Sequence, residues 1–205
     1  MKIEVLKSRQ QEIFPYLRDF KEFVLVGGTA LALQMGHRVS VDFDLFTEND
    51  LSARLLSKTK RIFRGCKVSI SIKLPEQFTV KIDDVKVDFV SHKFPFILSP
   101  IEFKKVKIAQ VPEIAAMKAY TLNFRGSNKD CVDLYFILKE GHSSLQEIAD
   151  IGEKKYGDEF NFRLFLEQLL YLDGLKRVDI EFLREKISEK QMKDFFTKEI
   201  KKLKL

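Results

Sequence analysis

Three aspartates lie in short segments with the pattern of β-strands, where their spacing could bring their carboxylates together. Asp42 and Asp44 alternate with apolar residues in the run Val41-Asp42-Phe43-Asp44-Leu45-Phe46. Successive side chains of a strand point to opposite faces, so this alternation puts both carboxylates on one face, about 6 to 7 Å apart along the chain. Asp88 lies between two apolar residues of a later run. If the two strands are neighbours, the three carboxylates converge.

Such a group of acids is suited to bind divalent metal ions. Neighbouring carboxylates repel each other, and a cation between them relieves that repulsion. Mg²⁺ and Mn²⁺ prefer carboxylate oxygens as ligands. Acidic pairs and triads of this kind serve two-metal phosphoryl transfer, in which the ions activate an attacking hydroxyl and neutralise the phosphates. We therefore expect Asp42, Asp44 and Asp88 to be metal ligands and catalytic residues, with Mg²⁺ or Mn²⁺ as the cofactor.

A glycine turn precedes the acidic strand. Gly27-Gly28-Thr29 follows the apolar run from Phe23 to Val26 and opens a segment rich in good helix formers. Glycines let the backbone approach a ligand closely, and the amino terminus of a helix offers N–H donors to phosphate. We expect a nucleoside triphosphate to bind here, with Thr29 adding a hydroxyl. Arg38 and Ser40 could hold a phosphate as well or could only fix the loop.

The order of these elements carries more information than any one of them, because a Gly-Gly turn or an acidic strand face is often only structural. A strand, a Gly-Gly-Thr turn, a short helix, an alternating acidic strand and a later acidic strand position form the arrangement of polymerase-β-like nucleotidyltransferases. More narrowly, the sequence resembles the AbiEii/AbiGii-type nucleotidyltransferase toxins. The stretches that carry this resemblance are Gly27 to Gln34, His37-Arg38, Ser40, Asp42 to Phe46, Glu113 to Ala119, Arg125 and Lys129 to Tyr135.

The resemblance implies that the chain is an enzyme that transfers NMP from an NTP to an acceptor hydroxyl and releases pyrophosphate. It implies the toxin component of a toxin–antitoxin or abortive-infection system, with a tRNA or other RNA 3′ end as acceptor and a cognate antitoxin as partner. By position, it makes Asp88 a metal ligand or the base for the acceptor hydroxyl, and it brings Lys118 to the triphosphate. Many nucleotidyltransferases have Gly-Ser in this turn, whereas this chain has Gly27-Gly28-Thr29, so whether Thr29 replaces the serine stays open.

Two positions in the later motifs have structural alternatives. Lys118 lies in an otherwise apolar helical stretch, so it is either catalytic and nucleotide-binding or a lysine that extends along the helix edge to solvent. Asp130 and Asp133 are three residues apart and share a helix face. They are suited to a helix cap and an ion pair with Lys118 or Arg125, and nucleotide binding by Asp130 is the alternative.

The pattern along the chain predicts an α+β fold, in which a mixed sheet of about five strands with flanking helices precedes a helical domain. Residues 1–105 would form the nucleotidyltransferase catalytic core, and residues 106–205 would form the helical domain and contribute to the active-site cleft. The expected strands are 23–26, 41–46, 67–74, 77–82 and 85–90, with 106–109 as a further candidate. The expected helices cover 14–20, 29–36, 51–63, 112–124, 130–139, a segment after Ser144, 160–172 and 180–203.

Composition limits the remaining possibilities. The 205 residues carry a net charge of +6, which favours an anionic partner such as a nucleotide or RNA. Cys66 and Cys131 stand far apart without metal-ligand spacing, so we expect two buried free thiols. No secretion signal or membrane-spanning run is recognisable, which predicts a cytoplasmic protein without a membrane partner. Two alternatives to nucleotide transfer onto RNA stay open. The acceptor could be a small molecule or a protein side chain, or the chain could be a non-catalytic module that binds nucleotides or nucleic acid.

Overall fold

The computed structural model describes residues 1–203, and the chain divides into two compact units. The sheet unit comprises Met1–Pro95 and Ser99–Ala109, and the helical unit comprises Phe96–Leu98 and the chain from Gln110 onward. Residues 204 and 205 of the expected helical domain lie outside the described part. Residues 106–109 group with the sheet unit because their strand joins its sheet, whereas the sequence pattern divided the chain after residue 105.

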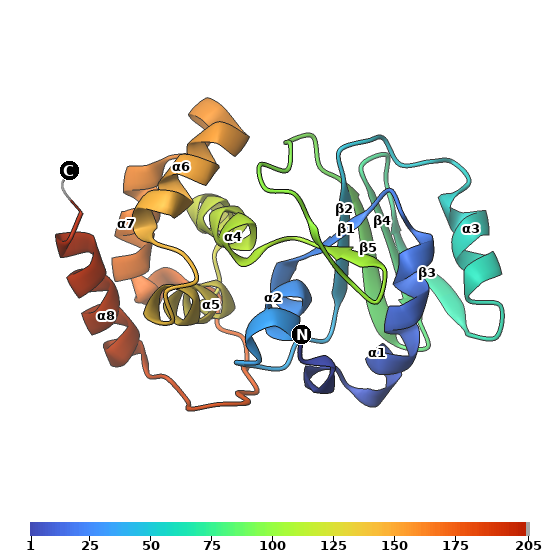
Figure 1. The fold of residues 1–205 in the computed structure, drawn as a ribbon, viewed down its shortest axis with the longest axis horizontal. Coiled ribbons are helices and arrows are strands. Elements are labelled where there is room, and N and C mark those ends of the chain that lie inside the picture. The colour runs from blue at the N-terminus through green and yellow to red at the C-terminus, as the bar shows by residue number, and fades with distance from the viewer. Residues whose placement is uncertain (204–205) are drawn as a thin grey trace. The chain divides into compact units, whose positions relative to one another are not determined.

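The sheet unit is built on one seven-stranded mixed sheet (Figure 1). Its strands are β1 (Val24–Val26), β2 (Phe43–Thr47), β3 (Val68–Lys73), β4 (Gln77–Ile82), β5 (Val85–Ser91), β6 (Ile101–Phe103) and β7 (Val106–Ile108). The spatial order is β3-β4-β5-β2-β1-β7-β6. The central strand β2 is antiparallel to β1 and parallel to β5. The α+β class is confirmed, but the sheet has two more strands than the five that we expected.

The sheet has one apolar and one polar face in its centre. Phe43 and Leu45 of β2 are in register with Val87 and Phe89 of β5, and all four side chains are buried. The intervening residues point to the other face by strand alternation, and they include Asp44 and Asp88. The apolar face forms the core, which leaves the opposite face for polar side chains.

The helices of the sheet unit cover this apolar face and flank the sheet. They are η1 (Ile3–Val5), α1 (Ser8–Ile13), η2 (Phe14–Asp19), α2 (Gly27–Met35) and α3 (Leu55–Ile62). The ring of Phe14 lies 6.2 Å from that of Phe43, and the ring of Phe20 lies 4.9 Å from that of Phe89. The predicted helix over 14–20 is a 3-10 helix, and Pro15 lies at its start because proline cannot continue the hydrogen-bonding of α1.

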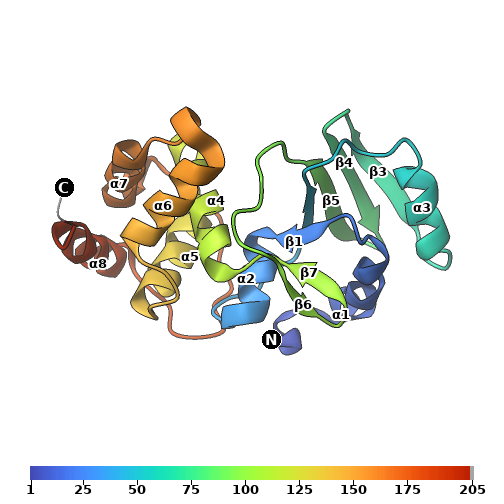
Figure 2. The same ribbon diagram turned by 45° about the horizontal axis from the view of Figure 1, so that its top comes forward.

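The helical unit consists of α4 (Val111–Arg125), α5 (Asn128–Lys139), α6 (Leu145–Tyr156), η3 (Gly157–Glu159), α7 (Phe162–Leu170), η4 (Leu172–Gly174) and α8 (Glu189–Lys201). Helix α4 packs against α5, α6 and α7 (Figure 2). The sequence predicted a helix over 180–203, but the helix begins only after Ser188. The side chain of Ser188 accepts a hydrogen bond from the Gln191 N–H and completes a capping box, which fixes the start of α8 at this point.

The structure adds one strand that the sequence did not predict, and it shows the surroundings of the two cysteines. Strand β6 was not predicted, because three residues with two exposed side chains show no hydrophobic period. Cys131 is buried, and this burial raises the pKa of its thiol to about 12. Cys66 is only half-buried, which corrects the expectation of two buried thiols. No helix within residues 1–203 is both long and apolar enough to span a membrane.

Candidate active site

Asp44 and Asp88 are direct neighbours on the polar face of the sheet. They are paired in register on the parallel strands β2 and β5, and strands in a sheet lie about 5 Å apart. Asp42 directly precedes β2, which begins at Phe43 and not at Val41 as we expected. The fold therefore brings two of the three predicted acids together through backbone pairing and places the third in the segment that leads into β2.

The Asp88 carboxylate is buried and has two polar partners. The Thr79 hydroxyl donates a hydrogen bond to Oδ1, and the Lys86 ammonium lies 2.5 Å from Oδ2. Burial lowers the pKa of Lys86, but its contact with Asp88 and the charges of Asp42 and Asp44 outweigh that effect and raise it. A cation thus already lies within the electrostatic field of all three acids. Lys86 was not predicted to be a site residue, although it precedes Asp88 by two residues and therefore lies on the same strand face.

The glycine turn lies against the acids on one side and against Arg38 and Ser40 on the other. Gly27 has φ +68°, and a Cβ atom there would lie 2.3 Å from Asp44 Oδ2. A Cβ atom at Gly28 would lie 2.7 Å from an Arg38 guanidinium nitrogen and 3.0 Å from Ser40 Oγ. Gly27 has a backbone conformation that side-chain-bearing residues rarely adopt, and a side chain at Gly28 would displace Arg38 or Ser40.

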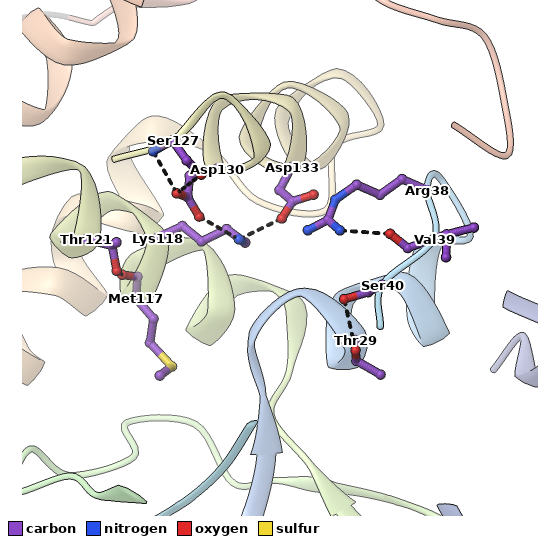
Figure 3. A network of polar contacts seen from close by, with 10 residues as sticks. All are labelled: Thr29, Arg38, Val39, Ser40, Met117, Lys118, Thr121, Ser127, Asp130 and Asp133. Atoms are coloured by element: carbon purple, nitrogen blue, oxygen red, sulfur yellow. Dashed lines mark hydrogen bonds and ion pairs between the residues drawn. The ribbon is translucent and has the colours of Figure 1, made fainter. Parts of the chain in front are cut away.

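The hydroxyl of Thr29 has structural partners. It is buried and lies 2.9 Å from Ser40 Oγ (Figure 3). It also contacts the carbonyl oxygen of Asp42. Arg38 is buried as well, and its guanidinium donates to the carbonyl of Val39 at 3.0 Å. These contacts connect the turn with the segment that carries Asp42. Helix α2 begins at Gly27, and the residue at its N-cap, Val26, makes no side-chain hydrogen bond to the first turn.

The predicted lysine–aspartate contacts are present in the helical unit. Lys118 Nζ lies 2.9 Å from Asp130 Oδ1 and 2.6 Å from Asp133 Oδ2 (Figure 3). Asp130 also accepts hydrogen bonds from the backbone N–H and the hydroxyl of Ser127, which forms the capping box of α5. Burial raises the pKa of the Asp130 carboxyl, but Lys118 and Ser127 outweigh that effect and hold it below its usual range. This confirms the predicted cap and ion pair.

A second buried ion pair in the helical unit was not predicted. Lys155 Nζ lies 2.8 Å from Glu113 Oε1, and both side chains have no solvent exposure. Glu113 Oε2 accepts hydrogen bonds from the N–H groups of Ile97 and Leu98, at 3.1 and 3.0 Å. The Lys155 ammonium also lies 4.7 Å from the ring centre of Phe96. The pair therefore holds the segment Phe96–Leu98 against the helices. No pattern around Lys155 could have revealed it from sequence.

The chemistry of the acidic residues fits a hard divalent cation, although the side chains do not form a complete coordination sphere. Asp44 and Asp88 offer carboxylates from adjacent strands, and the ammonium of Lys86 shows that positive charge is stable beside Asp88. Within residues 1–203, no three or more His, Cys, Asp or Glu side chains are arranged to hold a metal ion together. This agrees with the position of Asp42 ahead of the strand.

Comparisons with known proteins identify the family. A family model described as "Nucleotidyl transferase AbiEii toxin, Type IV TA system" matches residues 12–204. An uncharacterized protein of Aquifex aeolicus is 30% identical over 204 residues, and the match covers 96% of each chain.

Two solved structures share the fold. The nucleotidyltransferase toxin MenT4 of Mycobacterium tuberculosis has a TM-score of 0.61 at 16% identity, covering 95% of this chain and 82% of that one. The Helicobacter pylori protein JHP933 has a TM-score of 0.53 at 16% identity, covering 96% of this chain and 97% of that one. Since the family model spans nearly the whole sequence, this chain is a nucleotidyltransferase that belongs to the AbiEii toxin family of type IV toxin–antitoxin systems.

Proposed function

We propose that this nucleotidyltransferase transfers NMP from an NTP to a hydroxyl at the 3′ end of an RNA such as tRNA, and releases pyrophosphate. The observation that carries the proposal is the in-register pair of Asp44 and Asp88 beside the Gly27-Gly28 turn. Metal-dependent phosphoryl transfer needs carboxylates that bind the metal ions, and it needs a backbone turn that phosphates can approach closely.

In this proposal, Asp42, Asp44 and Asp88 hold Mg²⁺ or Mn²⁺. A bound divalent ion lowers the pKa of the acceptor hydroxyl and neutralises the charge of the phosphates. Asp88 acts as a further metal ligand or accepts the proton of the attacking hydroxyl. Lys86 helps to hold the Asp88 side chain in place, because its ammonium contacts that carboxylate.

The remaining residues bind and orient the triphosphate. Gly27 and Gly28 bring the backbone close, and the first turn of α2 offers N–H donors to the phosphates. The Arg38 guanidinium and the Ser40 hydroxyl, next to Gly28, add donors. Thr29 contributes by fixing the segment that carries Asp42.

Lys118 binds the triphosphate through its ammonium. Asp130 and Asp133 hold that ammonium in position, and Asp130 is a candidate contact for the nucleotide.

An RNA acceptor is supported by the net charge of +6 and by the toxin family, in which we expect an antitoxin partner. A small molecule or a protein side chain is the alternative acceptor. A module without turnover is disfavoured, because keeping Asp44 and Asp88 adjacent costs stability when no function requires them.

The test is transfer of α-phosphate label from each NTP, with Mg²⁺ or Mn²⁺, to total tRNA. We expect labelled RNA and a loss of at least about a hundredfold in Asp44→Asn. Asp84→Asn is the matched control, because Asp84 is an exposed acid of the same sheet. Label that moves only to a protein or a small molecule would refute the RNA acceptor, and undiminished labelling by Asp44→Asn would refute the site.

A further inference from the structure

A second candidate site lies on the apolar side of the sheet. A pocket of about 540 Å³ is present between η2, the loop that follows it, and the β6–β7 hairpin. It is lined by Leu17, Arg18, Asp19, Phe20, Lys21, Phe23, Leu45, Glu102, Lys105, Val106 and Lys107. Small-molecule sites in proteins commonly have volumes of about 300 to 1,000 Å³, so this pocket has the size of a ligand site.

Strand alternation separates this pocket from the acids. Leu45 lines the pocket, and the preceding residue of β2 is Asp44. Adjacent side chains of a strand point to opposite faces, so the pocket and the Asp44–Asp88 pair lie on opposite faces of the sheet. A ligand in the pocket therefore cannot be the nucleotide that the acids would process.

The charge around the pocket is positive in sum and is only partly balanced by two acids. Lys107 lies opposite Glu102 in the β6–β7 pairing, and its Nζ donates a hydrogen bond to the Lys21 carbonyl at 3.0 Å. The rim cations, as we call them, are Arg18, Lys21, Lys105 and Lys107, and the rim also carries Asp19 and Glu102. All six side chains are exposed, whereas the apolar lining residues are buried. None of the rim cations forms an ion pair within residues 1–203. The nearby Lys58, by contrast, is paired with Glu22 at 2.9 Å. Four unpaired cations against two acids favour an anionic ligand.

The β6–β7 turn that presents Lys105 is strained. Lys104 and Lys105 have φ +49° and +65°, and these two residues form the whole connection between the paired residues Phe103 and Val106. Such two-residue turns favour Asn and Gly, because other side chains are disfavoured at positive φ. Strained positions of this kind tend to occur where they have a function.

The other turn of this type has charged contacts with the rest of the sheet unit, whereas in the lysine turn the Lys104 ammonium lies 5.6 Å from the ring centre of the neighbouring Phe103. Asp83 and Asp84 have φ +43° and +71°, but aspartate tolerates this conformation better. The Asp83 carboxylate also accepts a hydrogen bond from the Lys67 N–H at 2.6 Å and pairs with Arg9. Lys105 has no such partner in the described chain. Local structure thus accounts for the aspartates but not for the lysine.

We propose that this pocket binds a phosphorylated small molecule of nucleotide size, with its phosphates against the rim cations and its organic part against the apolar lining. Lysine and arginine are the usual partners of phosphate, and the buried apolar residues offer a surface to a base or another flat group. The pocket contains no acidic cluster, so this binding needs no divalent ion.

The experiment is calorimetric titration of the full chain with ADP, GDP and inorganic pyrophosphate in EDTA, in an Asp44→Asn/Asp88→Asn background that disables the proposed metal site. We expect a nucleoside diphosphate to bind. The double reversal Arg18→Glu/Lys105→Glu should weaken that binding at least about tenfold, since both cations face the phosphates. The matched control is Lys190→Glu/Lys198→Glu, which makes the same charge change at exposed lysines of α8.

Three results of these titrations would overturn the proposal. They are no binding of any of the three probes, binding that survives the rim reversal, and equal weakening by the α8 control. Binding of an RNA oligonucleotide alone, without any nucleoside diphosphate, would also overturn it. Thermal melting monitored by circular dichroism establishes that the variants are folded. Because the assay needs neither transfer activity nor metal, its failure leaves the proposed function untouched.

Discussion

Helix α4 carries two buried charges of opposite sign, and each has a partner in the helical unit. Glu113 pairs with Lys155, both side chains are fully buried, and two backbone N–H groups also bind the carboxylate. Lys118 pairs with Asp130 and Asp133, but its side chain and that of Asp130 keep 9% and 16% of their exposure. The first centre is fully satisfied and closed, whereas the second retains a route to a ligand. Burial of a charge alone therefore does not identify a functional residue.

The largest loss of unfolding free energy should come from removing Lys155 from its buried ion pair with Glu113. Lys155→Met leaves the Glu113 carboxylate buried without its cation, and breaking such a pair costs about 3–5 kcal/mol of unfolding free energy. Urea denaturation measures this loss. The double variant Glu113→Gln/Lys155→Met removes both charges and should recover part of it. If the single variant lost less than the double variant, Glu113 would not depend on Lys155.

Lys118→Met should affect transfer more than it affects stability. If Lys118 binds the triphosphate as we propose, removing its cation should lower kcat/KM about a hundredfold, which corresponds to about 2.7 kcal/mol. Some loss of unfolding free energy is expected as well, because the fully buried Asp133 loses its cation, whereas Asp130 keeps Ser127 as a partner and some exposure. Lys118→Arg is the control that keeps the charge. An Lys118→Met enzyme with full activity per folded molecule would give Lys118 the same structural role as Lys155.

Ser127→Ala tests whether the second centre depends on its cap. The Ser127 hydroxyl binds Asp130 at 2.8 Å, and loss of a helix cap costs about 1 kcal/mol. We expect that loss in urea denaturation and a change in kcat/KM of less than about threefold, because Lys118 still holds Asp130. A much larger drop in kcat/KM would mean that the cap, and not the lysine, positions the site.

The smallest effect should be on the stability of the protein at acidic pH. The pKa of Asp130 is lowered in the folded state, so this group adds stability above its unfolded pKa of about 3.9 and loses it as the pH falls towards the folded value. Unfolding free energies of Asp130→Asn should therefore fall less steeply than those of the parent below about pH 4. Parallel curves for the two proteins would exclude this contribution. Asp173→Asn, at an exposed position, is the control.

Much of the sheet unit was predictable because local patterns and tertiary structure agree. The apolar run before Gly27, the acidic alternation around Asp44 and the turn at Asp83-Asp84 all correspond to observed elements. The predicted ends of strands and helices were less accurate where strand pairing or a helix cap sets them. Asp42 lies outside β2 because backbone pairing begins at Phe43, and α8 begins at a cap that hydrophobic periodicity does not report.

The partners in the site were harder to predict than its acids. Lys86 contacts Asp88 because both lie on one face of β5, and Thr79 contacts it because β4 and β5 pair in this register. A single sequence indicates which residues of a strand share a face, but it does not give the register between strands. The pairing of Glu113 with Lys155 joins residues 42 positions apart on two helices, and no local rule connects them. Local patterns therefore identified the acids, while most of their environment required the tertiary structure.

The central claim is that Asp44 and Asp88 form a metal site, and Mn²⁺ binding tests it most directly. Electron paramagnetic resonance of free Mn²⁺, with a non-hydrolysable NTP analogue present, reports the fraction bound. We predict that the parent and Asp84→Asn bind Mn²⁺ with similar affinity and that Asp44→Asn and Asp88→Asn each weaken binding at least about tenfold. Equal Mn²⁺ affinity in all four proteins would contradict the account.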